Sequence, residues 1–234
     1  MRLVYQPQKD IRTGEVVGFE ALLRWKHPTR GEVSPAEFIP IAEDTGVILQ
    51  IGEWVMRTAC REAASWSQPL TIAVNVSAMQ LHNDDFDRVV HEVLRETGLA
   101  PGRLELEITE TALIRDLNRT LATLRRIKTM GIRIAMDDFG TGYSSLSNLR
   151  AFPFDKIKID RSFIKAVNDN GQAAAIVRLI LGLGRALNLP VLAEGVETSA
   201  ELDVLENELC NEAQGYLLGK PADIESYRQL TVAG

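Results

Sequence analysis

The sequence predicts an α/β fold, a TIM-like (β/α)8 barrel whose first strand runs antiparallel to its neighbour. Two observations lead to this prediction: short strand-like runs alternate with amphipathic helical stretches, and eight strand candidates occur along the 234 residues. Alternating strands and helices assemble into a mostly parallel sheet that is covered by helices. Eight strands suffice to close a barrel, and an open doubly wound sheet is the weaker alternative.

The chain begins with a predicted hairpin. Strand-like runs at residues 3–7 (LVYQP) and 15–25 (EVVGFEALLRW) flank the connector QKDIRTG, which is rich in turn-forming residues. Two strands joined in this way pair antiparallel. We therefore expect the first strand to run against the parallel order of the remaining strands.

Helical patterns occupy the stretches between the later strands. Residues 35–46 have a proline in the first turn, where proline is favoured. Residues 48–66 and 171–188 place apolar side chains at spacings of three and four. Residues 116–131 begin with aspartate, a favoured N-cap residue. The six remaining strand candidates are residues 70–77, 103–109, 132–138, 155–160, 189–195 and 213–218.

Composition and charge exclude several classes of function. The balance of 45% apolar and 25% charged residues is that of a soluble globular protein. A net charge of −6 argues against broad electrostatic binding to DNA or RNA. No apolar stretch approaches the ~20 residues that a membrane helix needs. The first ten residues also lack the apolar core of a signal peptide.

The cysteines and the early first strand suggest where the protein works. Cys60 and Cys210 lie far apart without metal-ligand spacing, which predicts two reduced thiols in a cytoplasmic protein. Strand-like sequence begins almost directly after Met1. We therefore expect residues 1–234 to be a single domain excised from a longer multidomain protein, whose full-length chain could carry a membrane anchor.

Polar side chains occupy one face of several strand candidates. Asn75 and Glu107 each lie opposite the branched apolar side chains of their own strands, because successive side chains of a strand alternate. Helices cover the outside of a barrel, so the polar face is expected to line the lumen. The rim at the carboxyl ends of the strands is where barrel enzymes build their active sites. The residues that come late in their strands are Glu107, Asp137, Lys158 and Glu194.

Such a cluster of acids needs neutralisation, by protonation, by cationic side chains or by metal ions. The donors expected at the rim are Glu20, Asn75, Glu107, Asp137, Asp138 and Glu194, with Lys158 beside them. One lysine cannot neutralise five carboxylates. Oxygen ligands without histidine or cysteine select hard cations such as Mg²⁺, Mn²⁺ or Ca²⁺. Two ions about 3.5–4 Å apart, bridged by one carboxylate, fit this number of ligands.

A series of motifs identifies the family that the chain resembles. FEALLRW is followed in order by SPAEFIPIAEDTG, NVS, ELEITE, DDFGTGYSSL, KIDRSFI, AEGVET and EAQGYLLGKP. Through these motifs the chain resembles the EAL domain family, bacterial phosphodiesterases specific for cyclic di-GMP, over essentially its whole length. Glu20-Ala21-Leu22 is the tripeptide that names the family.

The resemblance implies a barrel with an antiparallel first strand, two Mg²⁺ or Mn²⁺ ions at its mouth, and hydrolysis of cyclic di-GMP to linear 5′-pGpG. Ligands of the first ion are expected to be Glu20, Asn75, Glu107 and Asp137. Asp137 is expected to bridge to the second ion, which Asp138 and Glu194 serve. The resemblance also implies a homodimer and regulatory domains of GGDEF or sensory type in the full-length chain.

Further roles follow from the same resemblance. Lys158 matches the residue that orients or deprotonates the attacking water, and Glu194 is also assigned to catalysis. Glu110 matches a glutamate that holds the DDFGTGYSSL loop and couples the site to the dimer interface. The residues expected to contact the substrate or to order water beside it are Gln6, Arg24, Asp160, Glu197 and Gln214.

Alternative interpretations stay open at this point. Asn75 could cap the following helix, and Glu107 and Glu110 could form solvated pairs with Arg103 or Arg115. The whole chain could be a catalytically silent cyclic di-GMP receptor, although it retains the expected metal ligands. A general two-metal nuclease fits the acids but not the complete order of motifs.

Overall fold

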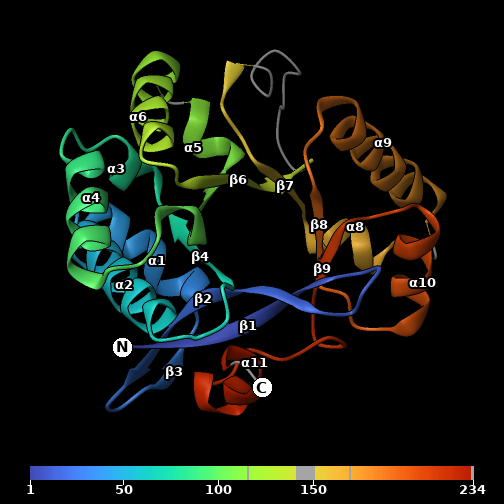
Figure 1. Cartoon of the computed structure of the whole chain (residues 1–234), viewed down its shortest axis with the longest axis horizontal. Helices are drawn as coiled ribbons and strands as arrows, with labels where there is room; N and C mark the ends of the chain where they lie inside the picture. Colours follow the sequence, from blue (N-terminus) through green and yellow to red (C-terminus); the bar gives the residue numbers. More distant parts are fainter. Residues whose placement is uncertain (115, 141–150, 169, 233–234) are drawn as a thin grey trace.

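Eight strands close into a barrel in the computed structural model, which describes residues 1–114, 116–140, 151–168 and 170–232. Hydrogen-bonded neighbours follow the order β1-β9-β8-β7-β6-β5-β4-β2, and pairing of β1 with β2 closes the ring. Figure 1 shows this ring of strands with most of the helices outside it. The predicted TIM-like barrel is confirmed, and the open doubly wound sheet is wrong because β1 and β2 close the sheet.

Strands and helices alternate along most of the chain. The strands are β1 (Arg2–Asp10), β2 (Val16–His27), β3 (Gly31–Val33), β4 (Thr71–Val76), β5 (Leu104–Thr109), β6 (Arg133–Phe139), β7 (Lys156–Ile159), β8 (Val191–Glu194) and β9 (Glu212–Gln214). The helices are α1 (Pro35–Asp44), α2 (Ile48–Ala64), α3 (Ala78–Leu81), α4 (Phe86–Thr97), α5 (Glu110–Ile114), α6 (Leu117–Thr129), α8 (Arg161–Lys165), α9 (Gly171–Leu187), α10 (Ser199–Asn207) and α11 (Arg228–Thr231).

The antiparallel first strand is confirmed. β1 pairs with β2 in the predicted hairpin and also runs antiparallel to β9 on its other side. From β2 to β9 the strands of the ring are parallel to one another. The sequence did not predict β3, a short strand that pairs with the far end of β2 outside the ring.

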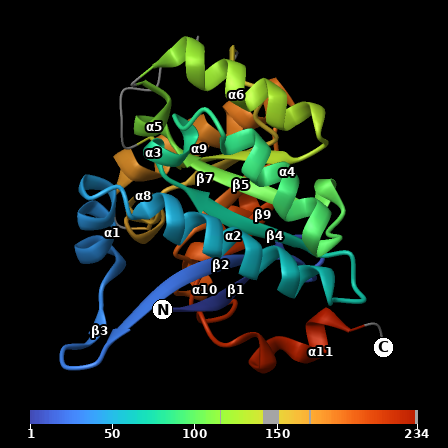
Figure 2. The same ribbon diagram turned by 90° about the vertical axis from the view of Figure 1, so that its left-hand side faces the viewer.

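Side-chain alternation assigns the two faces of the barrel as predicted. In β4, Ile72 and Val74 are fully or almost fully buried and belong to the apolar core that also includes Val55 and Met56 of α2. In Figure 2, α2, α4 and α6 lie over the outside of the strands. The polar side chains of the same strands are left to face the lumen.

The last strand is shorter than predicted because the chain turns at Gly215. A side chain there would collide with the backbone of Val196, whose nitrogen would lie 2.2 Å from the added carbon. Val196 instead exchanges backbone hydrogen bonds with Gln214 and Leu217 across this turn. β9 therefore ends at Gln214, which leaves the Gln214 side chain at the mouth of the barrel.

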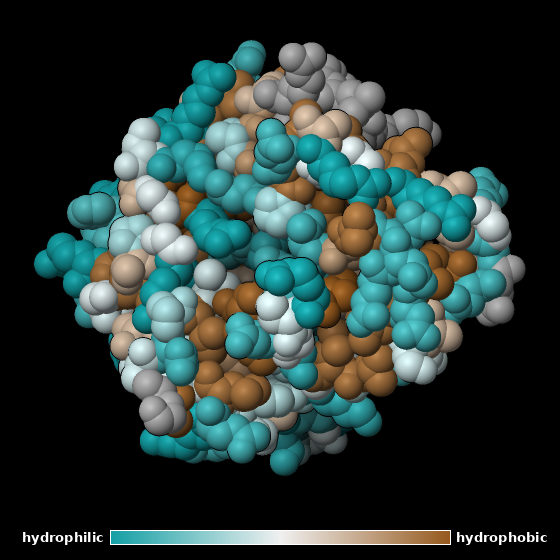
Figure 3. Space-filling view, turned by 45° about the vertical axis from the view of Figure 1, so that its right-hand side comes forward, coloured by the Kyte–Doolittle hydropathy of each residue, from teal (hydrophilic) through white to brown (hydrophobic). Residues whose placement is uncertain are grey.

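The outer face that carries α9 and α10 mixes hydrophilic and hydrophobic residues (Figure 3). Among the described residues, none of the helices combines the length and the apolar character that crossing a membrane requires.

Candidate active site

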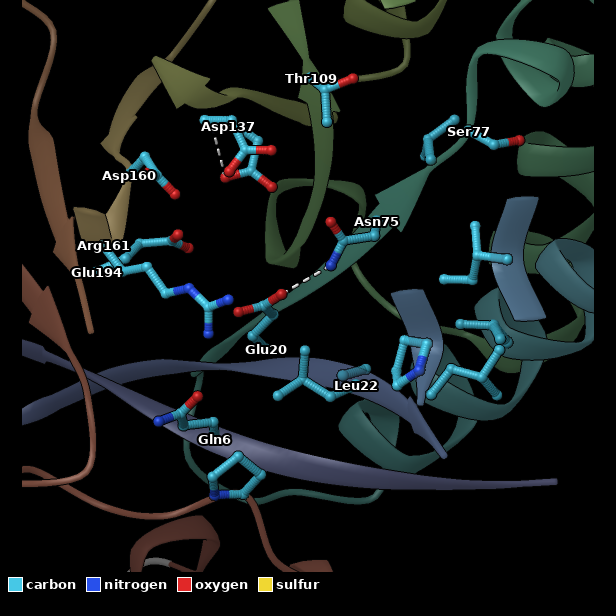
Figure 4. Close-up of a pocket in the computed structure, with 18 of the residues that line it drawn as sticks. Gln6, Glu20, Leu22, Asn75, Ser77, Thr109, Asp137, Asp160, Arg161 and Glu194 are labelled. Atoms are coloured by element: carbon cyan, nitrogen blue, oxygen red, sulfur yellow. Dashed lines mark hydrogen bonds between the residues drawn. The ribbon is translucent and has the colours of Figure 1, made fainter. Parts of the chain in front are cut away.

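The carboxyl ends of the parallel strands open into a cavity of about 1160 Å³. Most of the predicted site residues line it, and they come from β1, β2, β4, β6, β8 and β9 and from the segments that follow β7 and β8 (Figure 4). The predicted residues on its wall are Gln6, Glu20, Arg24, Asn75, Asp137, Asp138, Asp160, Glu194, Glu197 and Gln214. Distant parts of the sequence thus meet at one end of the barrel.

Lys158 lies at the floor of this cluster. The side chain leaves the middle of β7, points into the lumen and is 0% exposed. Its Nζ lies 2.8 Å from Glu107 Oε1, 2.7 Å from Glu194 Oε1 and 3.3 Å from Asp137 Oδ1. One buried ammonium therefore holds together carboxylates from β5, β6 and β8.

Glu20 is fixed by two amide side chains from neighbouring strands. Asn75 Nδ2 donates to Glu20 Oε1 at 2.7 Å, and Gln214 Nε2 donates to Glu20 Oε2 at 2.5 Å. The first of these bonds is drawn in Figure 4. The N-cap of the helix after β4 is Ser77, so Asn75 is not the cap that the alternative interpretation assumed. Glu20 is 5% exposed, and its orientation is set before any ligand arrives.

Asp137, Asp138 and Glu194 form a second group of carboxylates at the rim. One oxygen of each lies within 4.8 Å of the others. Asp138 has a left-handed backbone, with φ of 54°, and its N–H donates to Asp137 Oδ1 at 3.0 Å. This turn at the end of β6 allows two adjacent carboxylates to serve the same site, which consecutive residues of a regular strand would not do.

Burial and neighbouring charges shift the pKa values of the ionisable groups in the cluster. Burial raises the pKa of Glu194 to about 8, and burial together with the charge of Asp137 raises the pKa of Asp138 to about 6. Burial also raises the pKa of Glu107 well above its usual range. For Lys158, burial acts to lower the pKa of the amine, but the surrounding carboxylates outweigh it and raise the pKa. One ammonium thus does not offset the acids, and some carboxyls keep their protons near neutral pH.

The donor set fits hard divalent cations. All candidate ligands are carboxylate or amide oxygens, and three of the carboxylates already approach one another within 4.8 Å. Asp137 and Glu194 belong to this trio and also contact Lys158, so both connect the two halves of the cluster. The arrangement can accommodate a pair of ions with a shared carboxylate ligand.

Comparison with known proteins gives the family. A family model described as the EAL domain matches residues 1–221. The chain belongs to the EAL domain family. The structure described as the PaMucR phosphodiesterase in complex with c-di-GMP is 44% identical to it, covers 97% of this chain and 93% of that chain, and has a TM-score of 0.94.

Two Pseudomonas aeruginosa proteins illustrate the curated relatives of this EAL domain. The bifunctional diguanylate cyclase/cyclic di-GMP phosphodiesterase MucR is 46% identical over 228 residues, which make up 95% of this chain and 33% of MucR. The cyclic di-GMP phosphodiesterase PA2567 is 41% identical over 222 residues, 94% of this chain and 38% of that protein. The EAL domain thus spans little more than a third of the length of these two relatives.

Two glutamines and Glu197 complete the polar wall of the EAL domain site. Gln214 donates to Gln6 Oε1 at 3.0 Å as well as to Glu20, and Gln6 donates in turn to the Gly219 carbonyl at 3.0 Å. Glu197 lies on the rim and pairs with Lys165 at 2.7 Å. Gln6 and Gln214 form a continuous chain of hydrogen bonds that supports Glu20.

Asp160 and Glu110 occupy different surroundings. Asp160 caps α8 by accepting the Ser162 N–H at 3.0 Å, and its side chain still lines the cavity. Glu110 begins α5, is 5% exposed and is not on the cavity wall. The loop that Glu110 is predicted to hold falls mostly at residues 141–150, outside the described residues. Glu107 is 1% exposed and paired with Lys158, so it is buried and not in the solvated pair that the alternative interpretation assumed. Arg115, one of the two arginines named in that interpretation, lies outside the described residues.

Sequence reasoning missed two parts of the site. One is an apolar wall contributed by β2, α1 and α2, which includes Leu22, Ile39 and Ile51. The other is Arg161, which directly follows Asp160 and lines the cavity. The motif KIDRSFI contains Arg161, but a residue just beyond a strand end follows no strand periodicity, so alternation could not assign it to the lumen.

Proposed function

We propose that this EAL domain is a metal-dependent phosphodiesterase that hydrolyses cyclic di-GMP to linear 5′-pGpG. The observation that carries the proposal is the cluster of oxygen donors around Lys158, which opens into a cavity of about 1160 Å³. The names of MucR and PA2567 include cyclic di-GMP phosphodiesterase, and these proteins match 95% and 94% of the chain. The site and the family therefore support the same reaction.

The cofactors that we propose are two Mg²⁺ or Mn²⁺ ions. Glu20, Asn75, Glu107 and Asp137 would hold one ion, and Asp138 and Glu194 would hold the other with Asp137 shared. When bound, the ions supply Lewis-acid activation of a water and neutralise charge on the scissile phosphate. The hydrogen bonds that fix Glu20 lower the reorganisation needed for ligation, because Asn75 and Gln214 already orient its carboxylate.

Lys158 is proposed to orient the attacking water. Its ammonium carries three N–H donors, and Glu107 and Glu194 fix its position at 2.8 and 2.7 Å. The carboxylates raise the pKa of the amine, which keeps Lys158 charged near neutral pH. A charged ammonium would donate a hydrogen bond to the water and so orient it.

The remaining wall residues are proposed to bind the substrate. Arg24 leaves β2 on the same face as Glu20 and lines the cavity, where its planar guanidinium suits a phosphate. Gln6, Asp160, Glu197 and Gln214 are proposed to contact the nucleotide or to order water beside it. Glu110 is proposed to hold the loop after β6, which would couple the site to a second copy of the chain.

Product analysis tests the proposal directly. The purified chain is incubated with cyclic di-GMP and Mn²⁺, and the products are separated by chromatography. We expect cyclic di-GMP to disappear and 5′-pGpG to accumulate, and we expect little turnover in Ca²⁺, which is larger and less strict in its geometry. Asp137→Asn should lose most of the turnover, whereas Asp203→Asn, an exposed change on α10, should not.

Two other outcomes separate the alternatives. Binding of cyclic di-GMP in Mn²⁺ without product formation would favour a catalytically silent receptor. Rapid cleavage of arbitrary single-stranded DNA would favour a general two-metal nuclease. Wild-type turnover in Asp137→Asn would reject the proposed role of the metal cluster.

The assembly and context of the protein are also proposals. We infer that the chain forms a homodimer, as the family resemblance implies. The chain spans 33% of MucR, which supports the proposal that its parent protein carries regulatory domains of GGDEF or sensory type. A cytoplasmic location of the domain is likewise proposed, because its nucleotide substrate is expected there.

A further inference from the structure

Three cationic side chains line the cavity wall among the described residues: Arg24, Arg161 and Lys165. Lys165 is already paired with Glu197 at 2.7 Å, and Arg24 donates to the carbonyl of its neighbour Leu23 at 2.9 Å. Arg161 has no carboxylate within 4.0 Å among the described residues, although the wall around it is rich in acids. Its donors are available to an anionic ligand.

The fold places Arg161 beside Glu194, one of the proposed metal ligands. Arg161 is the first residue of α8, and its base packs against the turn after β8. Gly195 forms that turn with φ of +72°, and a side chain there would lie 2.5 Å from the Arg161 Cβ. The absence of a side chain at Gly195 therefore lets Arg161 lie directly beside Glu194.

The side chain of Arg161 extends from this position into the mouth of the barrel. Figure 4 shows the side chain entering the cavity beside Glu194, with its end turned toward Glu20. Both glutamates belong to the proposed metal-ligand set. A guanidinium at this place would lie next to a scissile phosphate that ions held between the same two glutamates.

Arg24 lies on the opposite wall. In the ring order β1-β9-β8-β7-β6-β5-β4-β2, the strand β2 that carries Arg24 is four places from β7, which leads into Arg161. Four places in a ring of eight is the greatest possible separation. Cyclic di-GMP carries two phosphodiesters on opposite sides of its macrocycle, so two cationic groups on opposite walls match its two negative charges.

We propose that Arg161 is a further catalytic residue that binds the nonbridging oxygens of the phosphate to be cleaved, while Arg24 binds the other phosphate. The inference rests on the proposed function and divides the substrate contacts between the two walls. Guanidinium binds phosphate through two parallel N–H donors, a geometry that an ammonium does not reproduce. As water attacks, Arg161 stabilises the charge on the phosphate oxygens and the 3′ oxygen leaves with a proton from water.

Two substrates distinguish the roles of the two arginines. Cyclic di-GMP has two phosphodiesters, whereas bis(p-nitrophenyl) phosphate has one. Arg161→Ala should lower kcat/KM in Mn²⁺ for both substrates, by roughly 100-fold or more. Arg24→Ala should lower kcat/KM for cyclic di-GMP but leave bis(p-nitrophenyl) phosphate within about twofold of wild type. Added guanidinium should restore part of the activity of Arg161→Ala, and Arg161→Lys should be intermediate at best.

Binding measurements keep the test independent of turnover. In Ca²⁺, Arg161→Ala should weaken cyclic di-GMP binding by about tenfold or more, because a charge-assisted contact is lost. Arg178→Ala, which removes an exposed arginine on α9 that pairs with Glu208, is the matched control and should leave the Kd unchanged. Mn²⁺ binding by Arg161→Ala should equal or exceed that of wild type, since the change removes a positive charge near the ligands.

Results that reject the role of Arg161 can be distinguished from results that reject the phosphodiesterase function. An inactive wild type would overturn the phosphodiesterase proposal, and the Ca²⁺ binding data would still judge Arg161. An unchanged Kd for Arg161→Ala, or full activity on bis(p-nitrophenyl) phosphate, would overturn the role given to Arg161. Weakened Mn²⁺ binding would show that Arg161 only supports the fold of the rim, and it would overturn the inference too.

Discussion

Lys158 is the residue on which the candidate site depends most. It is fully buried, and carboxylates from three strands lie within 3.3 Å of its Nζ. A buried cation with several acidic partners costs desolvation free energy, which the ion pairs offset. The same residue therefore has two roles: its charge offsets part of the negative charge of the acids when no other cation is near them, and it is proposed to orient the attacking water.

Replacing Lys158 should reveal the neutralising task. In EDTA, Lys158→Met should lower the free energy of unfolding by about 3–5 kcal/mol, because buried carboxylates lose the ammonium that pairs with them. Mn²⁺ should then stabilise the variant more than the wild type. Urea denaturation with and without Mn²⁺ measures both effects.

Lys165→Met provides the matched comparison for that experiment. Lys165 is 49% exposed and makes one ion pair, so its loss should cost less than about 1 kcal/mol. Equal stabilisation of Lys158→Met and wild type by Mn²⁺ would contradict the account of Lys158 as the internal counter-ion of the acids.

Individual residues also show which parts of the site could be predicted from the sequence. Side-chain alternation and position near the end of a strand predicted that Glu107, Asp137 and Lys158 lie at one rim. In the structure, Glu107 and Asp137 both contact Lys158. That reasoning could not predict the left-handed turn at Asp138 or the place of the Arg161 guanidinium on the cavity wall. Both depend on how a strand ends, and local backbone geometry rather than periodicity decides that.

Among the elements, α10 begins just after Glu197, a residue of the cavity wall. Its N-cap Thr198 accepts the Glu201 N–H at 3.2 Å, and Glu201 Oε2 accepts the backbone N–H groups of Glu197 and Thr198 at 2.7 and 3.1 Å. This capping box satisfies N–H groups that have no partner in the helix. It also fixes the backbone of Glu197, a rim residue.

Loss of this cap should weaken α10. Thr198→Ala should lower the free energy of unfolding by about 1 kcal/mol, as measured by chemical denaturation, because it removes the acceptor for the Glu201 N–H. Ser199→Ala, at the next residue, makes no cap contact and should change stability by less than about 0.5 kcal/mol. Equal effects of the two substitutions would argue against the cap.

Local sequence signals predicted the start of α6 but not the end of β9. The helix at residues 116–131 was predicted from its cap and is observed as α6, with Asp116 accepting the Arg119 N–H at 3.2 Å. β9 was predicted too long because the close approach of Gly215 to the Val196 backbone, where the strand ends, joins segments that are separated in the sequence. Tertiary contacts of this kind leave no mark on local patterning.

The whole barrel is braced by a second cluster at the end opposite to the site. Lys156, two residues before Lys158 on the same face, has its Nζ 2.9 Å from Glu105 Oε1 and 2.8 Å from Glu212 Oε2. These partners come from β5 and β9, so the ion pairs cross the lumen. Alternation within β7 and β5 puts Lys156 and Glu105 on the same faces as Lys158 and Glu107, but only closure of the barrel brings in Glu212.

This basal cluster should matter for stability and not for chemistry. Lys156→Met should lower the free energy of unfolding by about 3–5 kcal/mol, because it leaves the 0%-exposed Glu105 without its closest partner. At 10 °C, where the folded form still predominates, kcat and KM for cyclic di-GMP should stay within about twofold of wild type. A large loss of kcat in the folded variant would show that the two ends of the barrel are coupled.

The central claim is that side chains from separate strands cage a pair of divalent ions at the mouth of the barrel. Anomalous diffraction from crystals grown with Mn²⁺ and cyclic di-GMP measures this most directly. We predict two manganese peaks about 3.5–4 Å apart, with Asp137 touching both and the cleaved phosphate over them. Crystals with bound cyclic di-GMP but no manganese among these carboxylates would contradict the account.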